Sequence, residues 1–286
     1  MSKRIELLII DPQNDFCTEK VESNGKVLHQ GALYVSGAEN DMSRLAKMID
    51  RVGSKLYDIH VTLDSHRLVD ISHPIFWEDG NGKAPDPFTI ISYTDVKNGV
   101  WKARNPGYQA RAVNYVKTLE DNARYPLCIW PPHCLIGSWG HNLVPCIFDS
   151  LLKWEAENFA NVDFVTKGSN PFTEHYSGVQ ADVPDSTDPS TQLNTKLIST
   201  LQDADIILLS GEARSHCLAN TVRDIASKFD SDGNGEFIKK MILLEDATSD
   251  VGDLPGSTMF KDMGEAFVSE MEEKGMKIST TESLLL

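Results

Sequence analysis

The chain has 286 residues, with 42 acidic against 27 basic side chains and a formal net charge of −15. A charge of this sign repels nucleic acids and anionic membranes unless a local basic patch exists, and the sequence has no such patch. No apolar run approaches the roughly 20 residues of a membrane span. We therefore expect a soluble, cytoplasmic protein without a nucleic-acid or membrane partner.

The cysteine content argues against a disulfide framework. The chain has five cysteines, an odd number, and no two of them form a CxxC pair. Disulfide-rich secreted domains and cysteine-rich zinc modules show paired spacings, which are missing here. A reducing compartment is the simpler assumption, and there a single thiol can stay free and reactive.

Apolar runs bounded by turn residues predict strands at residues 5–10, 56–63, 127–130, 162–165, 206–209 and 241–244. Helical spacing of apolar residues predicts helices at residues 38–52, 108–120, 141–154, 191–201, 216–229 and 257–273. Strands that are apolar throughout and alternate with helices are typical of a parallel sheet covered on both faces. We therefore predict a three-layer α/β sandwich around a mainly parallel sheet.

Two connections interrupt this alternation. Residues 74–106 are rich in Gly, Pro, Asp and aromatic residues, and residues 178–190 form a polar connector. Neither stretch has the composition of a separate domain or a disordered linker. We therefore expect one domain that spans residues 1–286.

Three residues of catalytic types follow predicted strands. Cys217 follows the strand at 206–209 and stands in the first helical turn after it, where the helix dipole favours a thiolate. Asp11 comes directly after the strand at 5–10 and can act as a base, although a turn or cap role is the alternative. Lys167, after the strand at 162–165, can stabilise both anions or can be a solvated flank. Ligands of parallel α/β sheets bind at this edge.

Residues of the types that bind metals follow two further predicted strands. Asp64 and His66 come after the strand at 56–63, and His133 comes after the strand at 127–130. One carboxylate and two imidazoles suit zinc, iron or manganese, with coordination positions left for water and substrate. Histidines at loop tips are also common as plain surface residues. His73 stays open as an additional ligand.

These motifs together resemble the isochorismatase-like cysteine hydrolases, and among them the nicotinamidases. The matching blocks are residues 11–17 (DPQNDFC), 64–66 (DSH), 130–134 (WPPHC) with Gly137, 167–168 (KG), 176–178 (YSG) and 211–217 (GEARSHC). The resemblance implies a six-stranded parallel α/β sandwich, in agreement with the pattern of apolar runs. It also implies a homo-oligomer.

The resemblance assigns a role to each catalytic residue. It makes Cys217 the nucleophile, Asp11 the base that takes its proton, and Lys167 the cation that holds the two together. It also makes the peptide between Glu212 and Ala213 a cis bond, with the N–H groups of Ala213 and Cys217 forming an oxyanion hole.

The resemblance also defines a substrate and a metal. Asp64, His66 and His133 would hold a divalent metal, with zinc favoured and iron or manganese as alternatives. Three aromatic residues would line the ring pocket, or else pack in the core: Phe16, Trp130 and Tyr176. The reaction would convert nicotinamide to nicotinate and ammonia through a thioester. A hydrolase of another small amide or ureido compound and a non-catalytic scaffold are the alternatives.

Three stretches depart from the resemblance. Residues 67–129 form an enlarged insertion, and the eight residues between Lys167 and Tyr176 include Pro171 and His175. Residues 230–236 begin like a calcium-binding loop, but the twelfth position is Met241, where calcium needs a glutamate. We therefore expect a polar turn there rather than a calcium site.

Overall fold

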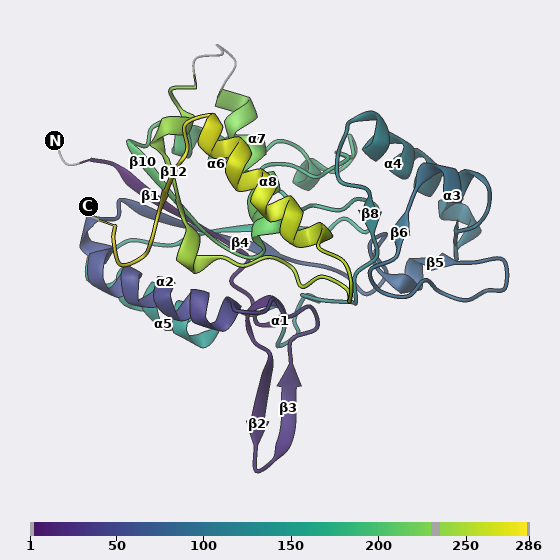
Figure 1. The fold of residues 1–286 in the computed structure, drawn as a ribbon, viewed down its shortest axis with the longest axis horizontal. Coiled ribbons are helices and arrows are strands. Elements are labelled where there is room, and N and C mark those ends of the chain that lie inside the picture. Colours follow the sequence, from purple (N-terminus) through teal and green to yellow (C-terminus); the bar gives the residue numbers. More distant parts are fainter. Residues whose placement is uncertain (1–2, 230–234, 285–286) are drawn as a thin grey trace.

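A computed structural model describes residues 3–229 and 235–284, and its centre is a sheet of six parallel strands (Figure 1). The strand order is β12-β11-β10-β1-β4-β9. Their bounds are β1 Ile5–Ile10, β4 Asp58–Asp64, β9 Asp163–Lys167, β10 Ile206–Gly211, β11 Met241–Leu244 and β12 Lys277–Ser279. All six residues of β1 are buried, which explains why this strand is apolar almost throughout.

Helices cover both faces of the sheet. Helices α2 and α5 lie on one face, and α6, α7 and α8 lie on the other (Figure 1). Their bounds are α2 Ala38–Val52, α5 Pro145–Asn158, α6 Thr195–Gln202, α7 Ala219–Phe229 and α8 Met259–Glu273. The predicted three-layer α/β sandwich is therefore confirmed. No helix among residues 3–229 and 235–284 is long and apolar enough to cross a membrane.

One predicted strand does not belong to the sheet. Only Leu127–Cys128 of the run at 127–130 is a strand, β8, and it pairs antiparallel with β6, Ile90–Ile91. The sixth strand of the sheet is instead β12, at the edge beside β11. Strand β12 is short and half exposed, so its sequence lacks the apolar run by which a buried strand is recognised.

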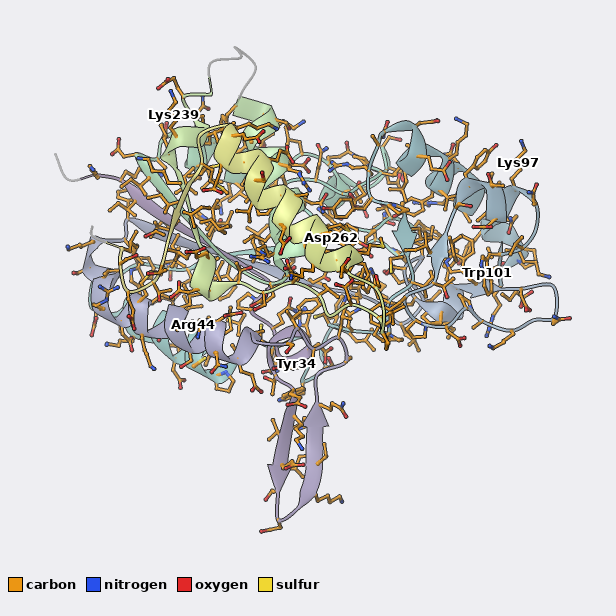
Figure 2. All side chains as sticks on the ribbon, in the orientation of Figure 1. Tyr34, Arg44, Lys97, Trp101, Lys239 and Asp262 are labelled. Carbon is orange, nitrogen blue, oxygen red and sulfur yellow. The ribbon has the colours of Figure 1, made fainter. Side chains whose placement is uncertain are left out.

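The inserted residues form a lobe beside the sheet (Figure 1). The lobe comprises β5 Trp77–Glu78, β6, α3 Tyr93–Lys97, β7 Lys102–Ala103, α4 Gln109–Asp121 and β8. It has its own hydrophobic cluster, which includes Trp77, Tyr115 and Leu127. Figure 2 labels Lys97 and Trp101 on its outer side, away from the sheet.

A hairpin projects from the body between the first helix and α2. Its strands are β2 Lys20–Ser23 and β3 Lys26–Gln30, and it follows α1, Asn14–Cys17. Every residue of both strands is exposed, and side chains project from both sides of the ribbon (Figure 2).

Short turns of helix complete the description. The 3-10 turns are Gly53–Lys55, Pro74–Phe76, Pro106–Tyr108, Pro189–Thr191, Ile238–Lys240 and Glu245–Ala247, and Arg214–Leu218 is a π-helical turn. The acidic stretch considered for calcium lies largely outside the described residues, because these omit 230–234.

Candidate active site

The sheet brings the three predicted catalytic residues to one edge. Ile10 and Gly211 are register partners at the ends of β1 and β10, so the chain segments that follow them lie side by side. Asp11 begins one segment, and Cys217 lies six residues beyond Gly211 in the other. Lys167 ends β9, and two strands, β1 and β4, lie between β9 and β10.

The ammonium group of Lys167 connects the three side chains. Its Nζ lies 2.9 Å from Asp11 Oδ2 and 3.6 Å from Cys217 Sγ. It also lies 3.2 Å from Asp64 Oδ1, on the neighbouring strand β4. Burial alone would lower the pKa of Lys167, but Asp11 and Asp64 raise it well above its usual value. The lysine is therefore a permanent cation at the centre of the site.

Asp11 is held by a side chain that the sequence patterns did not single out. The Thr62 hydroxyl donates to Asp11 Oδ1 at 2.5 Å and accepts from the backbone N–H of Asp11 at 3.0 Å. Burial raises the pKa of Asp11, although Lys167 opposes this shift. A raised pKa makes this carboxylate a better proton acceptor than an exposed aspartate.

The thiol of Cys217 differs from the expected thiolate. Burial raises the pKa of Cys217 well above its usual value, and Lys167 only partly offsets this effect. The residue lies in the π-helical turn Arg214–Leu218, and α7 starts after it at Ala219. Desolvation therefore outweighs the favourable helix end, and the resting thiol is protonated.

The turn after β10 has the backbone form that the resemblance implies. The peptide between Glu212 and Ala213 is cis. Gly211 has φ +109°, and a Cβ at that position would lie 2.1 Å from the Ile10 carbonyl oxygen, so only glycine fits. Among the described residues no hydrogen bond is donated by the Ala213 N–H, which leaves it free for an oxyanion.

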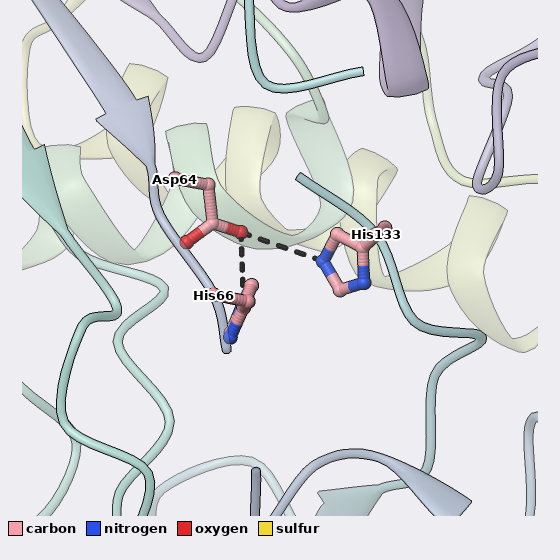
Figure 3. Close-up of side chains that lie close together, drawn as sticks. All are labelled: Asp64, His66 and His133. Carbon is pink, nitrogen blue, oxygen red and sulfur yellow. Dashed lines mark hydrogen bonds and ion pairs between the residues drawn. The ribbon is translucent and has the colours of Figure 1, made fainter. Parts of the chain in front are cut away.

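The three predicted metal donors converge beside the triad (Figure 3). Asp64 Oδ2 lies 3.1 Å from His66 Nε2 and 3.4 Å from His133 Nε2. All three side chains are buried, and one donor atom of each lies within 4.8 Å of the others. Burial alone would lower the pKa of His66, but Asp64 and Asp70 raise it well above its usual value. The cluster therefore attracts positive charge, as a cation site must.

Second partners orient the two imidazoles. His66 Nδ1 lies 3.1 Å from Asp70 Oδ2, and His133 Nδ1 donates to the Pro131 carbonyl at 2.9 Å. The Nε2 atoms of both rings therefore point toward Asp64, where each can serve as a metal ligand when it is deprotonated. His66, His133 and Asp64 consequently fit a divalent metal with imidazole and carboxylate ligands.

His73 lies beside this cluster but outside its set of converging atoms. Its ring is 5.1 Å from that of His66 and 5.5 Å from that of His133, centre to centre. Burial and the two neighbouring histidines lower the pKa of His73 to about 4. Its Nε2 is buried and has no hydrogen-bond partner among residues 3–229 and 235–284, and its Nδ1 faces the Leu68 carbonyl.

A small cavity joins the thiol, the metal donors and the three predicted aromatic residues. Phe16, Trp130 and Tyr176 all line it together with Cys217. Trp130 Nε1 donates to the Tyr176 hydroxyl at 3.0 Å, which fixes two of these walls. The cavity volume is about 20 Å³, room for about one water molecule. A ring-bearing ligand therefore requires some of these side chains to move.

Two further polar residues line the cavity and were missed at the sequence level. Glu174 lies between Lys167 and Tyr176, and its Oε2 is buried with no hydrogen-bond partner in the part of the chain that the structure describes. Its Oε1 lies 3.8 Å from His66 Nε2. His216 directly precedes Cys217. The unusual length of the 167–176 connection was the available signal for Glu174, but a pattern cannot show that a loop acid is buried.

The fold is shared with proteins of known structure. A scan of protein-family models and a search of curated proteins gave no match. Solved structures that share the fold include nicotinamidases and pyrazinamidases.

The structural similarity extends over almost the whole chain. A nicotinamidase/pyrazinamidase from Acinetobacter baumanii has TM-score 0.60 and 18% identity, over 99% of both chains. The yeast nicotinamidase has TM-score 0.60 and 19% identity, over 96% of this chain and 98% of its own. A Pyrococcus horikoshii pyrazinamidase in complex with zinc has TM-score 0.51 and 18% identity, over 97% and 99%. At sequence identities this low, the structural similarity shows a common fold and does not show a common activity.

Proposed function

We propose that this protein is a cysteine amidohydrolase that converts nicotinamide to nicotinate and ammonia. The observation that carries the proposal is the position of Lys167, whose Nζ lies within 3.6 Å of Cys217 Sγ and 2.9 Å of Asp11 Oδ2 in a buried site. A thiol, a carboxylate and a fixed cation in contact are the parts that nucleophilic acyl transfer needs.

In the first half-reaction, the Cys217 proton passes to Asp11 as sulfur attacks the carboxamide carbon. The resting thiol is neutral, so the proton transfer accompanies the attack, and Lys167 stabilises the anions that form. The Ala213 N–H donates to the oxyanion. The carbon–nitrogen bond then breaks, and Asp11 returns the proton to the leaving ammonia.

In the second half-reaction, water cleaves the resulting thioester. Asp11 takes a proton from the attacking water, and the carbon–sulfur bond breaks to release the carboxylic acid. The proton held by Asp11 then returns to the Cys217 sulfur. Atoms and charges balance over the two halves, since one amide and one water give one acid and one ammonia.

Asp64, His66 and His133 would hold a divalent metal, for which zinc is favoured and iron or manganese are alternatives. When bound, such an ion supplies a Lewis acid that can orient the ring nitrogen of the substrate. The convergence of the three buried donors supports this assignment.

The alternative is a hydrolase of another small amide. This reading is favoured by Glu174, which adds a buried carboxylate to the wall of the cavity. The triad chemistry is the same in both cases, and only the shape of the acyl group differs.

The test is an ammonia-release assay on a panel of small amides, with and without a chelator. We expect release from nicotinamide by the wild-type protein and none by Cys217→Ala. Release from other amides but not from nicotinamide would support the alternative. If no amide released ammonia, the remaining hypothesis would be a non-catalytic scaffold protein of the same fold.

A further inference from the structure

The end of the inserted lobe contacts the turn that carries Cys217. Tyr125 lies between α4 and β8, within the insertion. Its hydroxyl donates to the Ser215 carbonyl at 3.2 Å. Ser215 belongs to the π-helical turn Arg214–Leu218, two residues before Cys217. A side chain of the lobe is therefore hydrogen-bonded to the segment that positions the proposed nucleophile.

A neighbouring guanidinium group fixes the direction of this hydrogen bond. Arg223 Nη1 donates to the Tyr125 hydroxyl oxygen at 2.8 Å. A guanidinium group has no acceptor, so the tyrosine oxygen must accept there, and its single proton is left for the Ser215 carbonyl. Burial raises the pKa of Tyr125, although Arg223 opposes this shift. The hydroxyl therefore keeps its proton at neutral pH.

Arg223 is itself held by a further element. It lies on α7, the helix that follows the turn, and its Nε donates to Glu270 Oε2 of α8 at 2.7 Å. This ion pair is partly buried, which limits its screening by salt. The Tyr125 oxygen thus lies between a cation anchored on two helices and the carbonyl of the turn. These contacts give the hydroxyl one position and fix the turn relative to it.

The ring of Tyr125 lies behind two residues of the cavity wall. Its centre is 5.6 Å from that of His216 and 6.2 Å from that of Tyr176. Both of these residues line the cavity beside Cys217, whereas Tyr125 is not among the described residues that do so. We therefore expect its hydroxyl to act on the reaction through the turn and not through contact with a ligand.

We propose that Tyr125 is a positioning residue whose hydroxyl holds the turn so that Cys217 Sγ stays beside Lys167 Nζ. The inference rests on the proposed amidohydrolase function and gives the inserted lobe a part in it. Sγ and Nζ are 3.6 Å apart, and their contact depends on that separation. A displacement of about 1 Å at a reacting group can lower a rate by about 100-fold, even when its origin lies outside the site.

Tyr125→Phe keeps the ring and removes the hydroxyl. We expect kcat for amide hydrolysis to fall by about 10-fold while KM stays within about 2-fold, because the cavity wall keeps its packing and only the nucleophile shifts. The thermal midpoint is measured on the same samples. An unchanged kcat would overturn the proposal, and so would a loss that appears only as a higher KM or as a smaller fraction of folded protein.

Tyr93→Phe is the matched control. Tyr93 lies on α3 of the same lobe, and its ring centre is 5.6 Å from Lys97 Nζ. Figure 2 places Lys97 on the outer side of the lobe. Loss of the Tyr93 hydroxyl should leave kcat and KM unchanged. An equal fall of kcat in both variants would overturn the assignment to Tyr125, because it would reveal a general effect of the lobe.

Alkylation of Cys217 by iodoacetamide tests the position of the thiol without turnover. Asp11 and Lys167 promote loss of the thiol proton, so a displaced thiol in Tyr125→Phe should react about 10-fold more slowly. Cys146 is exposed and should react at the same rate in both proteins, which makes it an internal control when mass spectrometry follows each peptide. Equal rates at Cys217 would overturn the proposal.

Failure of the amidase function is recognised separately. The wild-type protein would then release no ammonia from any amide, while alkylation would still report whether the Tyr125 hydroxyl positions Cys217.

Discussion

Lys167 Nζ lies 3.2 Å from Asp64 Oδ1. Through this contact the lysine beside Cys217 also touches the cluster of metal donors. The two residues are register partners at the ends of β9 and β4, so the sheet itself sets their separation. The same ammonium contacts Asp11 at 2.9 Å. Because two buried carboxylates share one counter-ion, a change at Lys167 alters both parts of the site.

Lys167→Met should destabilise the metal-free protein and make its stability depend more strongly on metal. The substitution leaves Asp11 buried without a counter-ion and leaves Asp64 with only the neighbouring His66, a defect that costs about 3–5 kcal/mol. A divalent cation bound by Asp64 would replace part of the lost charge. Urea unfolding with a chelator and with zinc should therefore show a larger zinc-dependent gain in the variant than in the wild type.

Lys196→Met is the matched control for this experiment. Lys196 is exposed and pairs with Asp163 at the other end of β9. Removal of an exposed ion pair should change the free energy of unfolding by no more than about 1 kcal/mol, with no dependence on zinc. Equal zinc-dependent gains in the wild type and Lys167→Met would contradict the shared counter-ion.

Cys217→Ala should abolish amide hydrolysis and leave the fold intact. Loss of a catalytic nucleophile lowers turnover by about 10³-fold or more, because the remaining groups cannot form the thioester. Cys146→Ala is the control, since Cys146 is exposed on α5 and should leave turnover unchanged. Ammonia release and far-ultraviolet circular dichroism are measured on both variants, and a fully active Cys217→Ala protein would rule out the proposed chemistry.

Most of the site could be predicted from the sequence because its residues follow buried strands. Asp11, Asp64 and Lys167 each stand at or just after an apolar run, and parallel strands end at a common edge. The cis peptide before Ala213 followed from the resemblance alone. Helix α2 was predicted with its observed bounds, because its apolar spacing is regular up to Val52.

What could not be predicted depends on burial and on long-range pairing. The edge strand β12 is only three residues long and half exposed, so the sequence pattern does not reveal it. The apolar run at 127–130 looks like a buried sheet strand, although its strand part pairs with β6 outside the sheet. The protonated state of Cys217 follows from desolvation by residues far away in the chain. Thr62 has an ordinary sequence context, and the length of the 167–176 connection does not show that Glu174 is buried. Only the folded chain brings Glu174 to the cavity and Thr62 to Asp11.

His133→Ala should weaken metal binding far more than His73→Ala. His133 Nε2 is among the converging donor atoms, whereas no atom of His73 belongs to that set in the described chain. Loss of one ligand should lower the affinity by about 100-fold or more, and loss of a neighbouring imidazole by about 10-fold or less. Competition with a chromogenic chelator measures both, and the visible spectrum of the cobalt form reports the ligand set. Equal losses in the two variants would make His73 a ligand.

Glu212→Gln should stabilise the protein increasingly as the pH rises. Burial and the nearby Asp41 raise the pKa of Glu212 well above its usual value of 4.5, and its Oε2 accepts from the Ser249 N–H. The folded chain therefore keeps a proton that the unfolded chain loses above about pH 4.5, so this contribution to stability is full at low pH and is lost as the pH rises. Glutamine is neutral throughout. Urea unfolding should show similar stability near about pH 5 and a gain on the order of 1–3 kcal/mol near about pH 8. Glu265→Gln on the exposed side of α8 controls for the lost charge, and a difference between Glu212→Gln and wild type that does not grow with pH would refute a buried neutral carboxyl.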